Sequence, residues 1–427
     1  MPEHTRHPGR RAFLGTAAAG AAALAAAGCQ ATVGPTSARA DSARGQLSDR
    51  VLPFEGTHQA GIATHAAHFG LMAAVNLVRP DRARLAQSLR ALTDEARRLV
   101  AGRRPEVRDD AFPPTETGVL GPDPRPHGLS LTLSVGASLF DERFGLADRR
   151  PRELVRMPFL ANDRLEERLS HGDLLLTLGA DQPDVLLHAL RQLLRRTRDN
   201  LVLHWMLDGY NRPDARPRPG QTRSSDKQGA AARNLLGFKD GTANLDVDDQ
   251  RLMDRYVWVG PDAGEPDWAV GGSYQAVRII RMFVEFWDRT PLAEQEALIG
   301  RHKMTGAPLG RDRETDLPRF DDDPKGGRTP LDAHIRLANP RSRRTEDSLI
   351  LRRGFNFSRG FDEAGRLDQG LAFVSYQASL AKGFLAVQAR LTGEPLEEYI
   401  LPVGGGFFYA LPGVRSGDGW LGEGLLA

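Results

Sequence analysis

Three short segments in the second half of the chain carry side chains that are able to do chemistry. The first, Gly237-Phe238-Lys239-Asp240-Gly241-Thr242-Ala243-Asn244, places a carboxylate between glycines that permit a tight backbone turn. The second carries a lone histidine, His334, and the third ends an apolar stretch with Arg352. A carboxylate can move protons, an imidazole can bind a metal, and a guanidinium can stabilise negative charge.

Each segment also has an ordinary structural explanation. Most Asp-Gly pairs are plain turns, and a lone histidine is more often a surface or core residue than a ligand. Arg336 and Arg341, which flank His334 in the sequence, suit anionic groups but suit water equally well. Arg352 is costly to bury without an anionic partner, unless the strand has just reached solvent there. Taken singly, the segments do not decide between chemistry and structure.

The composition limits how the chain can hold a metal. Its 427 residues are 40% apolar and 26% charged, which is typical of a globular protein. The one cysteine is Cys29, so a chain that begins beyond it has no thiol. Disulfides, zinc ribbons, thiolate haem and iron–sulfur clusters are then excluded, and no Cys-x-x-Cys-His motif exists for covalent haem. A metal must be held by His, Asp, Glu or a cofactor.

The charge of the chain argues against nucleic acid as a partner. The formal net charge is +2, and the basic residues are scattered among acidic ones instead of forming one stripe. We therefore expect no nucleic-acid binding.

The first forty residues have the features of a targeting segment. Arg10-Arg11-Ala12-Phe13-Leu14 precedes an Ala-rich run at residues 16–27, which resembles a twin-arginine export signal. The run is shorter than the ~20 apolar residues that span a bilayer. Cleavage after Ala40 is favoured, and lipidation at Cys29 is the alternative. The expected location is the periplasm, the cell envelope or the extracellular space.

Hydrophobic periodicity predicts an α+β chain with two similar halves. In the first half we expect strands within 61–78 and at 129–135 and 173–178, with helices at 81–99 and 184–203. In the second half we expect strands at 274–287 and 371–376, helices at 292–299 and 378–391, and a flexible turn at 404–406 before an aromatic strand. A Pro-, Gly- and Arg-rich stretch at 213–233 separates the halves as a linker or surface loop.

Together the three segments resemble the dye-decolourising peroxidase family. Asp240 falls on the distal acid of its Gly-x-x-Asp-Gly signature, His334 on the proximal haem ligand and Arg352 on the distal arginine. The spacings, 334 − 240 = 94 and 352 − 334 = 18, agree with those of the twin-arginine-exported branch, which includes deferrochelatase/peroxidases of iron-uptake operons. The resemblance also covers His171-Gly172-Asp173-Leu174-Leu175 and the Gly-Gly-Gly-Phe-Phe segment near the end.

The resemblance implies a duplicated ferredoxin-like fold, with two antiparallel sheets, helices and one haem b in the C-terminal half. The expected domains are a signal peptide at 1–40, an N-terminal domain at 41–212, the linker at 213–233 and a haem-binding domain at 234–427. Further haem contacts are expected at Gly241, Thr242, Ala243, Arg336, Asn339, Pro340 and Arg341. An acidic residue behind His334 is expected as well, with Glu397 and Glu398 as candidates.

The resemblance also implies an activity. We expect a haem peroxidase that reduces hydrogen peroxide and oxidises aromatic or dye-like donors, with Asp240 as acid and base and Arg352 as charge stabiliser. One alternative is a deferrochelatase, which takes iron from haem and leaves the porphyrin intact. Another is a haem carrier without turnover. A homodimer and partners from an iron-uptake system are further expectations.

Overall fold

The structure, a computed structural model, describes residues 50–427 with the exception of 65, 105–108, 123, 213–230 and 416. The predicted leader, including Cys29 and Ala40, lies outside the described residues, and so does most of the predicted linker at 213–233. Among the residues that are described, we find no helix whose length and apolar character would carry it across a bilayer.

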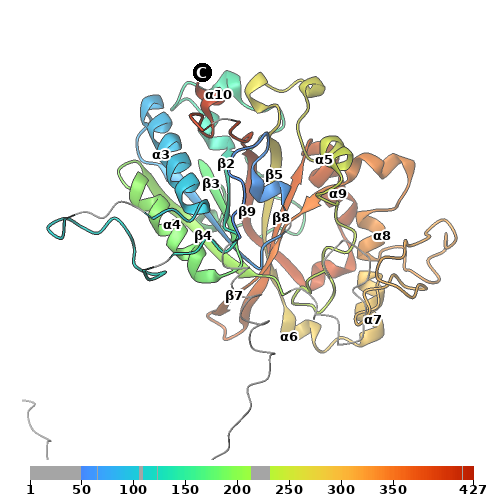
Figure 1. Cartoon of the computed structure of the whole chain (residues 1–427). Coiled ribbons are helices and arrows are strands. Elements are labelled where there is room, and N and C mark those ends of the chain that lie inside the picture. Colours follow the sequence, from blue (N-terminus) through green and yellow to red (C-terminus); the bar gives the residue numbers. More distant parts are fainter. Residues whose placement is uncertain (1–49, 65, 105–108, 123, 213–230, 416) are drawn as a thin grey trace, which may run out of the picture. The chain divides into compact units, whose positions relative to one another are not determined.

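Strands and helices follow one another in two runs that share the basic order strand–helix–strand–strand–helix–strand (Figure 1). In the second run, three short helices take the place of the first helix, and two consecutive strands take the place of the second strand. The first run comprises β1 (Phe69–Leu77), α3 (Arg82–Val100), β2 (Ser130–Gly136), β3 (Leu174–Ala180), α4 (Pro183–Thr197) and β4 (Leu201–Tyr210). The second comprises β5 (Ser273–Met282), α6 (Val284–Trp287), α7 (Leu292–Ile299), α8 (His334–Ala338), β6 (Leu351–Arg352), β7 (Phe355–Phe361), β8 (Leu367–Gln377), α9 (Ala386–Leu391) and β9 (Ile400–Ala410). The short helices α2 (Ala60–Ala63), α5 (Gln250–Tyr256) and α10 (Glu423–Leu426) lie outside these runs.

The strand order of each run is that of a ferredoxin-like sheet. The first run pairs in the order β2-β3-β1-β4 and the second in the order β9-β5-β8-β7, with every pairing antiparallel. In both runs the first strand is therefore central and the second lies at an edge. The predicted duplicated ferredoxin-like fold is confirmed.

Two short seams join the sheets of the two runs. At one seam, β2 pairs with β9 from Ser134↔Ala410 to Gly136↔Phe408. At the other, β4 meets β7 at the single pair Tyr210↔Asn356. Because β5 also pairs with β8, the order of hydrogen-bonded strands closes on itself. The two sheets are thus continuous, and the described residues between 50 and 427 belong to one compact unit.

The two long helices of the first run form where the periodicity predicts them. Asp81 caps α3 by accepting hydrogen bonds from the amides of Ala83 and Arg84, and Pro183 occupies the first turn of α4. The apolar stripe of α3 consists of Leu85, Leu89, Leu92 and Ala96 and is buried against the sheet. In Figure 1 both helices lie along the strands of the first run.

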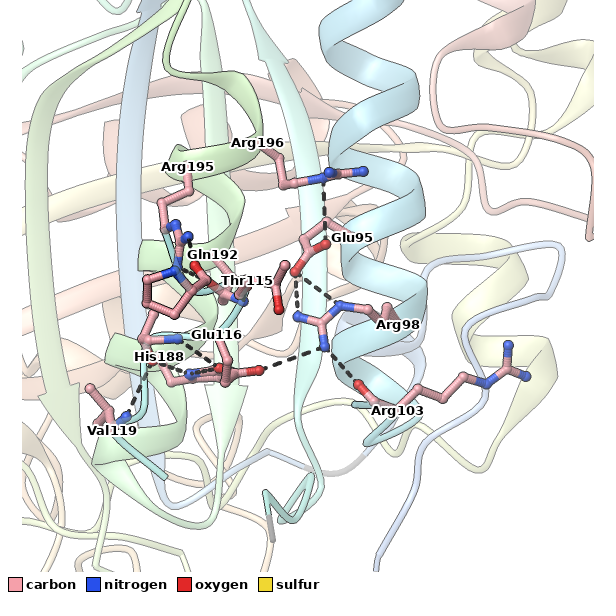
Figure 2. Close-up of polar contacts among 12 residues, drawn as sticks. Glu95, Arg98, Arg103, Thr115, Glu116, Val119, His188, Gln192, Arg195 and Arg196 are labelled. Atoms are coloured by element: carbon pink, nitrogen blue, oxygen red, sulfur yellow. Dashed lines mark hydrogen bonds and ion pairs between the residues drawn. The ribbon is translucent and has the colours of Figure 1, made fainter. Parts of the chain in front are cut away.

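Polar side chains on α4 also hold the long connection between α3 and β2 (Figure 2). His188 Nδ1 lies 2.6 Å from Thr117 Oγ1, and Gln192 Nε2 donates to the Thr115 carbonyl over 3.1 Å. Burial lowers the pKa of His188, whereas the nearby charge of Glu116 raises it, and the net direction is down. These contacts hold the connection against α4. They are distant in sequence from the three segments that carry the candidate catalytic residues.

Three predicted elements have wrong boundaries. The helix predicted at 184–203 ends at Thr197, and Leu201 begins β4. The strand predicted at 274–287 ends at Met282, after which residues 284–287 form the helical turn α6. Residues 404–406 are not a flexible turn but lie inside β9.

Two of the three glycines of β9, Gly404 and Gly405, are required by the close approach of other backbones. Gly405 has a φ of 117°, and a Cβ there would lie 2.0 Å from the carbonyl oxygen of Val277. The amide of His171 donates to the Gly405 carbonyl over 2.7 Å. The His171-Gly172-Asp173 motif therefore has a structural role, because it packs the first run against β9.

Candidate haem site

Asp240 lies in the predicted glycine-flanked turn. Its amide donates to the Ala232 carbonyl over 2.7 Å, which closes the turn from one side. Gly237 and Gly241 have φ values of 86° and 113°, a region that favours glycine. The turn therefore projects the carboxylate as the sequence predicts.

Arg352 is the partner of this carboxylate. Its Nη1 lies 2.5 Å from Asp240 Oδ1, and the two side chains are 31% and 25% exposed. β6 and β7 both pair with β8 and are separated by Arg353 and Gly354. Arg352 is therefore the last residue of β6, at the point where the strand is interrupted. The anionic partner that an arginine at the end of an apolar strand needs is thus Asp240.

Asn244 joins the Asp240 turn to the strand that carries Arg352. Its Nδ2 donates to the Arg352 carbonyl over 2.7 Å, and its Oδ1 accepts from the Arg352 amide over 2.8 Å. The side-chain amide thereby imitates a β-bridge. Asn244 belongs to the Gly-x-x-Asp-Gly segment, but sequence reasoning gave it no role, because the pairing spans more than one hundred residues.

His334 is the first residue of α8 and is held by a buried carboxylate. His334 Nδ1 lies 2.7 Å from Glu394 Oε2, and Glu394 is only 5% exposed. The acidic residue behind His334 is therefore Glu394, so the candidates Glu397 and Glu398 were wrong. Glu397 instead accepts from the amide of Gly393, and Glu398 is exposed.

Opposing effects act on the pKa of His334. Burial lowers it, but the charge and the hydrogen bond of Glu394 raise it, and the net direction is up. Arg352 lowers and Asp240 raises the same pKa, so both charges lie within electrostatic reach of the imidazole. The structure thus brings the three residues of the sequence motifs to one place.

The other predicted haem contacts differ in the hydrogen bonds and ring contacts that they already make within the protein. Thr242 donates from Oγ1 to Glu314 Oε1 over 2.9 Å. Arg336 donates to the Thr329 carbonyl over 2.9 Å and lies over the Phe320 ring. A carboxylate ligand would have to compete with these contacts for the guanidinium. The predicted haem contacts of Gly241, Thr242, Ala243 and Arg336 stay predictions.

The segment after His334 carries a further cation, Arg341. Asn339 Oδ1 accepts from the amide of Arg341, which has a positive φ of 57° and follows Pro340. Partial burial lowers the pKa of Arg341. Among the described residues, none forms a hydrogen bond with its guanidinium. Buried Arg301, which sequence reasoning missed, has its pKa lowered to about 10 by burial and by the charges of Arg341 and Arg352.

This donor set fits a haem. Glu394 engages Nδ1 of His334, so Nε2 is the ring nitrogen that can bind iron. Among the residues described, no group of three or more His, Cys, Asp or Glu side chains could hold a metal ion. Every residue of the contacting helices α8 and α9 keeps part of its surface exposed, and the partly buried His334 side chain is 32% exposed. The cations Arg301, Arg341 and Arg352 suit anionic propionates.

Comparison with known proteins agrees with this chemistry. The N-terminal Dyp-type peroxidase family model matches residues 59–211, and the C-terminal one matches residues 231–415. The chain is 48% identical to a deferrochelatase of Escherichia coli O157:H7 and 47% identical to that of Escherichia coli K12. Each alignment of 393 residues covers 91% of both chains.

Solved structures show the same fold. The oxyferrous complex of DtpA from Streptomyces lividans superposes with a TM-score of 0.78 at 33% identity, covering 90% of this chain and 99% of that one. A DyP-type peroxidase from Cellulomonas bogoriensis gives a TM-score of 0.76 at 34% identity, covering 89% and 99%. The family predicted from the motifs is confirmed: the chain belongs to the Dyp-type peroxidase family and is a haem-dependent enzyme.

Proposed function

We propose that Asp240, Arg352 and His334 form the peroxide-reducing centre of this peroxidase. The supporting observation is the 2.5 Å contact between Arg352 and Asp240 within electrostatic reach of His334. His334 would hold the iron through Nε2, with Glu394 increasing the basicity of the imidazole. A bound haem would supply the redox chemistry for the reduction of peroxide.

The protein side chains handle the proton and the charge. The Asp240 carboxylate accepts a proton from the inner oxygen of hydrogen peroxide and delivers it to the outer oxygen, which leaves as water. The Arg352 guanidinium stabilises the negative charge that develops on the leaving oxygen. Arg352 also keeps Asp240 oriented, because the two side chains are in contact before peroxide arrives. The electron donors are aromatic or dye-like molecules.

The relatives favour a second activity at the same site. Proteins that are 47–48% identical to this chain are named deferrochelatases, so release of iron from haem with the porphyrin intact is the second candidate. The products separate the two: oxidised donor for the peroxidase, and free iron with protoporphyrin for the deferrochelatase. A haem carrier needs neither Asp240 nor Arg352, and their pairing argues against that function.

The experiment follows the absorption spectrum of the haem-loaded protein at acidic pH, before and after one equivalent of peroxide. A shift of the Soret band on addition of peroxide supports the proposed centre if the shift is slower in Asp240→Ala and in Arg352→Ala. Intact peroxide turnover in both variants would show that the assigned roles are wrong. His334→Ala should lose or alter the haem spectrum, and an unaltered spectrum in this variant would remove His334 as the ligand.

We also propose export by the twin-arginine route and assembly as a homodimer. Export rests on the Arg10-Arg11 leader, with cleavage after Ala40 favoured over lipidation at Cys29. N-terminal sequencing of the exported protein distinguishes Asp41 from a blocked Cys29.

Light scattering of the purified protein gives its mass in solution, and a monomer would end the dimer proposal. Components of an iron-uptake system are the proposed partners.

A further inference from the structure

Backbone hydrogen bonds secure the Asp240 turn mainly on its N-terminal side. Arg233 forms an isolated bridge with Lys239, and the Asp240 amide donates to the Ala232 carbonyl. Beyond Asp240, the described residues show one backbone hydrogen bond within the turn, from the Asn244 amide to the Gly241 carbonyl over 3.0 Å. The backbone beside the carboxylate thus depends on side-chain contacts for its position.

One carboxylate spans this part of the turn. Glu314 accepts from Lys239 Nζ on Oε2 and from Thr242 Oγ1 on Oε1, the latter over 2.9 Å. Lys239 and Thr242 are the residues on either side of Asp240 and Gly241. Both oxygens of Glu314 are therefore used to fix the two ends of the segment that projects the Asp240 carboxylate.

The backbone of Glu314 is itself held by a buried arginine. Its carbonyl accepts from Arg301 Nη1 over 3.2 Å, and the same nitrogen donates to the Gly306 carbonyl over 2.7 Å. Arg301 is buried and lies within electrostatic reach of Arg352. The Glu314–Lys239 pair is itself mostly shielded from water, with 22% and 12% of the side chains exposed. A charge pair with this degree of burial resists rearrangement because separating two partly buried charges costs free energy.

We infer that Glu314 is a positioning residue for Asp240. It holds Lys239 and Thr242 so that the carboxylate between them stays directed at Arg352 and at the peroxide. This inference rests on the role proposed for Asp240. Misplacement of a catalytic group by about 1 Å can cost on the order of 100-fold in rate, so loosening the turn should be visible in the peroxide step.

The test is a double-mutant cycle measured on the haem-loaded protein. Glu314→Ala should lower the second-order rate constant for peroxide by roughly 10- to 100-fold and leave the KM for a dye donor unchanged. In an Asp240→Asn background the same substitution should have almost no further effect, because the group that it positions is already disabled. Glu314→Gln keeps the shape and one acceptor oxygen and should give an intermediate loss.

A second readout uses the haem-free protein and does not depend on activity. Amide hydrogen exchange of residues 239–244 should be faster in Glu314→Ala than in the parent chain. Glu296→Ala is the matched control: Glu296 is 17% exposed and accepts from His302 and the Lys303 amide, but it does not contact the Asp240 turn. Glu296→Ala should change neither this exchange nor the peroxide rate constant.

The outcomes separate the inference from the proposed function. If Asp240→Asn leaves the peroxide step unchanged, the role of Asp240 fails, and the role of Glu314 fails with it. If Asp240→Asn is slow while Glu314→Ala is normal, or if Glu314→Ala costs as much in both backgrounds, only the inference is overturned. If Glu314→Ala does not fold or bind haem, Glu314→Gln and Thr242→Val replace it in the same cycle.

Discussion

At the scale of single residues, motif and spacing identified the groups that meet at the site but not the groups that hold them. Asp240, His334 and Arg352 stand in segments whose residue types are unusual enough to be noticed. Glu394 and Glu314 stand in ordinary polar loops, and each acts on a partner at least 60 positions away. No periodicity records such a contact, because it exists only after the chain has folded.

The titration of His334 tests the role of Glu394 directly. In the haem-free protein, the pKa of His334 should lie above the ordinary value of about 6.5, because the charge and the hydrogen bond of Glu394 together outweigh burial. Glu394→Gln should move this pKa below 6.5, since burial then dominates. NMR of the imidazole protons against pH measures both values. Glu397→Gln, a change at one of the residues first considered, should leave the His334 titration where it is.

The same pKa shift predicts a pH-dependent contribution to stability. A folded-state pKa above the unfolded value means that the native state binds the proton more tightly. The His334–Glu394 contribution to stability is therefore fully present below about pH 6.5 and is lost as pH rises through the raised folded-state pKa. Urea unfolding of the haem-free chain on either side of this range should show the loss in the parent chain. Equal pH dependence in Glu394→Gln would contradict it.

At the scale of elements, strands that are largely buried were predictable from the sequence, whereas β4 and β7 were not. β1, β2, β3 and β8 are largely buried and appear in the sequence as apolar or alternating runs. β4 and β7 meet at a seam, and each exposes several residues to solvent, which weakens the pattern. The pairing at this seam forms only when the chain folds, since it joins two strands that are more than one hundred residues apart.

Gly209 should be the most sensitive position at the β4–β7 seam. A Cβ there would lie 2.4 Å from the Asn356 carbonyl oxygen, so Gly209→Ala forces the two strands apart. We expect a loss of about 1–3 kcal/mol in the free energy of unfolding, as for other overpacked sites. Gly260→Ala is the control, because no atom lies within 4 Å of its Cβ position. Urea denaturation of the two haem-free variants measures the difference, and equal stability would show that the seam tolerates the methyl group.

At the scale of the whole molecule, the two runs are joined by more than the seams of the sheet. Asp163 belongs to the first run and Arg278 to β5 of the second, and their side chains are 1% and 2% exposed. Arg278 Nη1 lies 3.0 Å from Asp163 Oδ2, and the second nitrogen contacts the other oxygen. The pair is buried from solvent between segments that belong to different runs. We therefore expect residues 50–427 to unfold in one cooperative transition rather than as two separate halves.

Removing one partner of this pair tests that cooperativity. Asp163→Asn leaves the Arg278 guanidinium buried without a counter-charge, which should cost about 3–5 kcal/mol of the free energy of unfolding. Because Asp163 and Arg278 belong to different runs, circular dichroism and tryptophan fluorescence should report the same shifted urea midpoint in the haem-free variant. Glu167→Gln is the matched control, since the Arg156–Glu167 pair is 64% and 72% exposed and should contribute nothing measurable. Two separated transitions in the parent chain would contradict the single cooperative transition, and a midpoint of Asp163→Asn equal to that of Glu167→Gln would show that the buried pair does not stabilise the contact between the two runs.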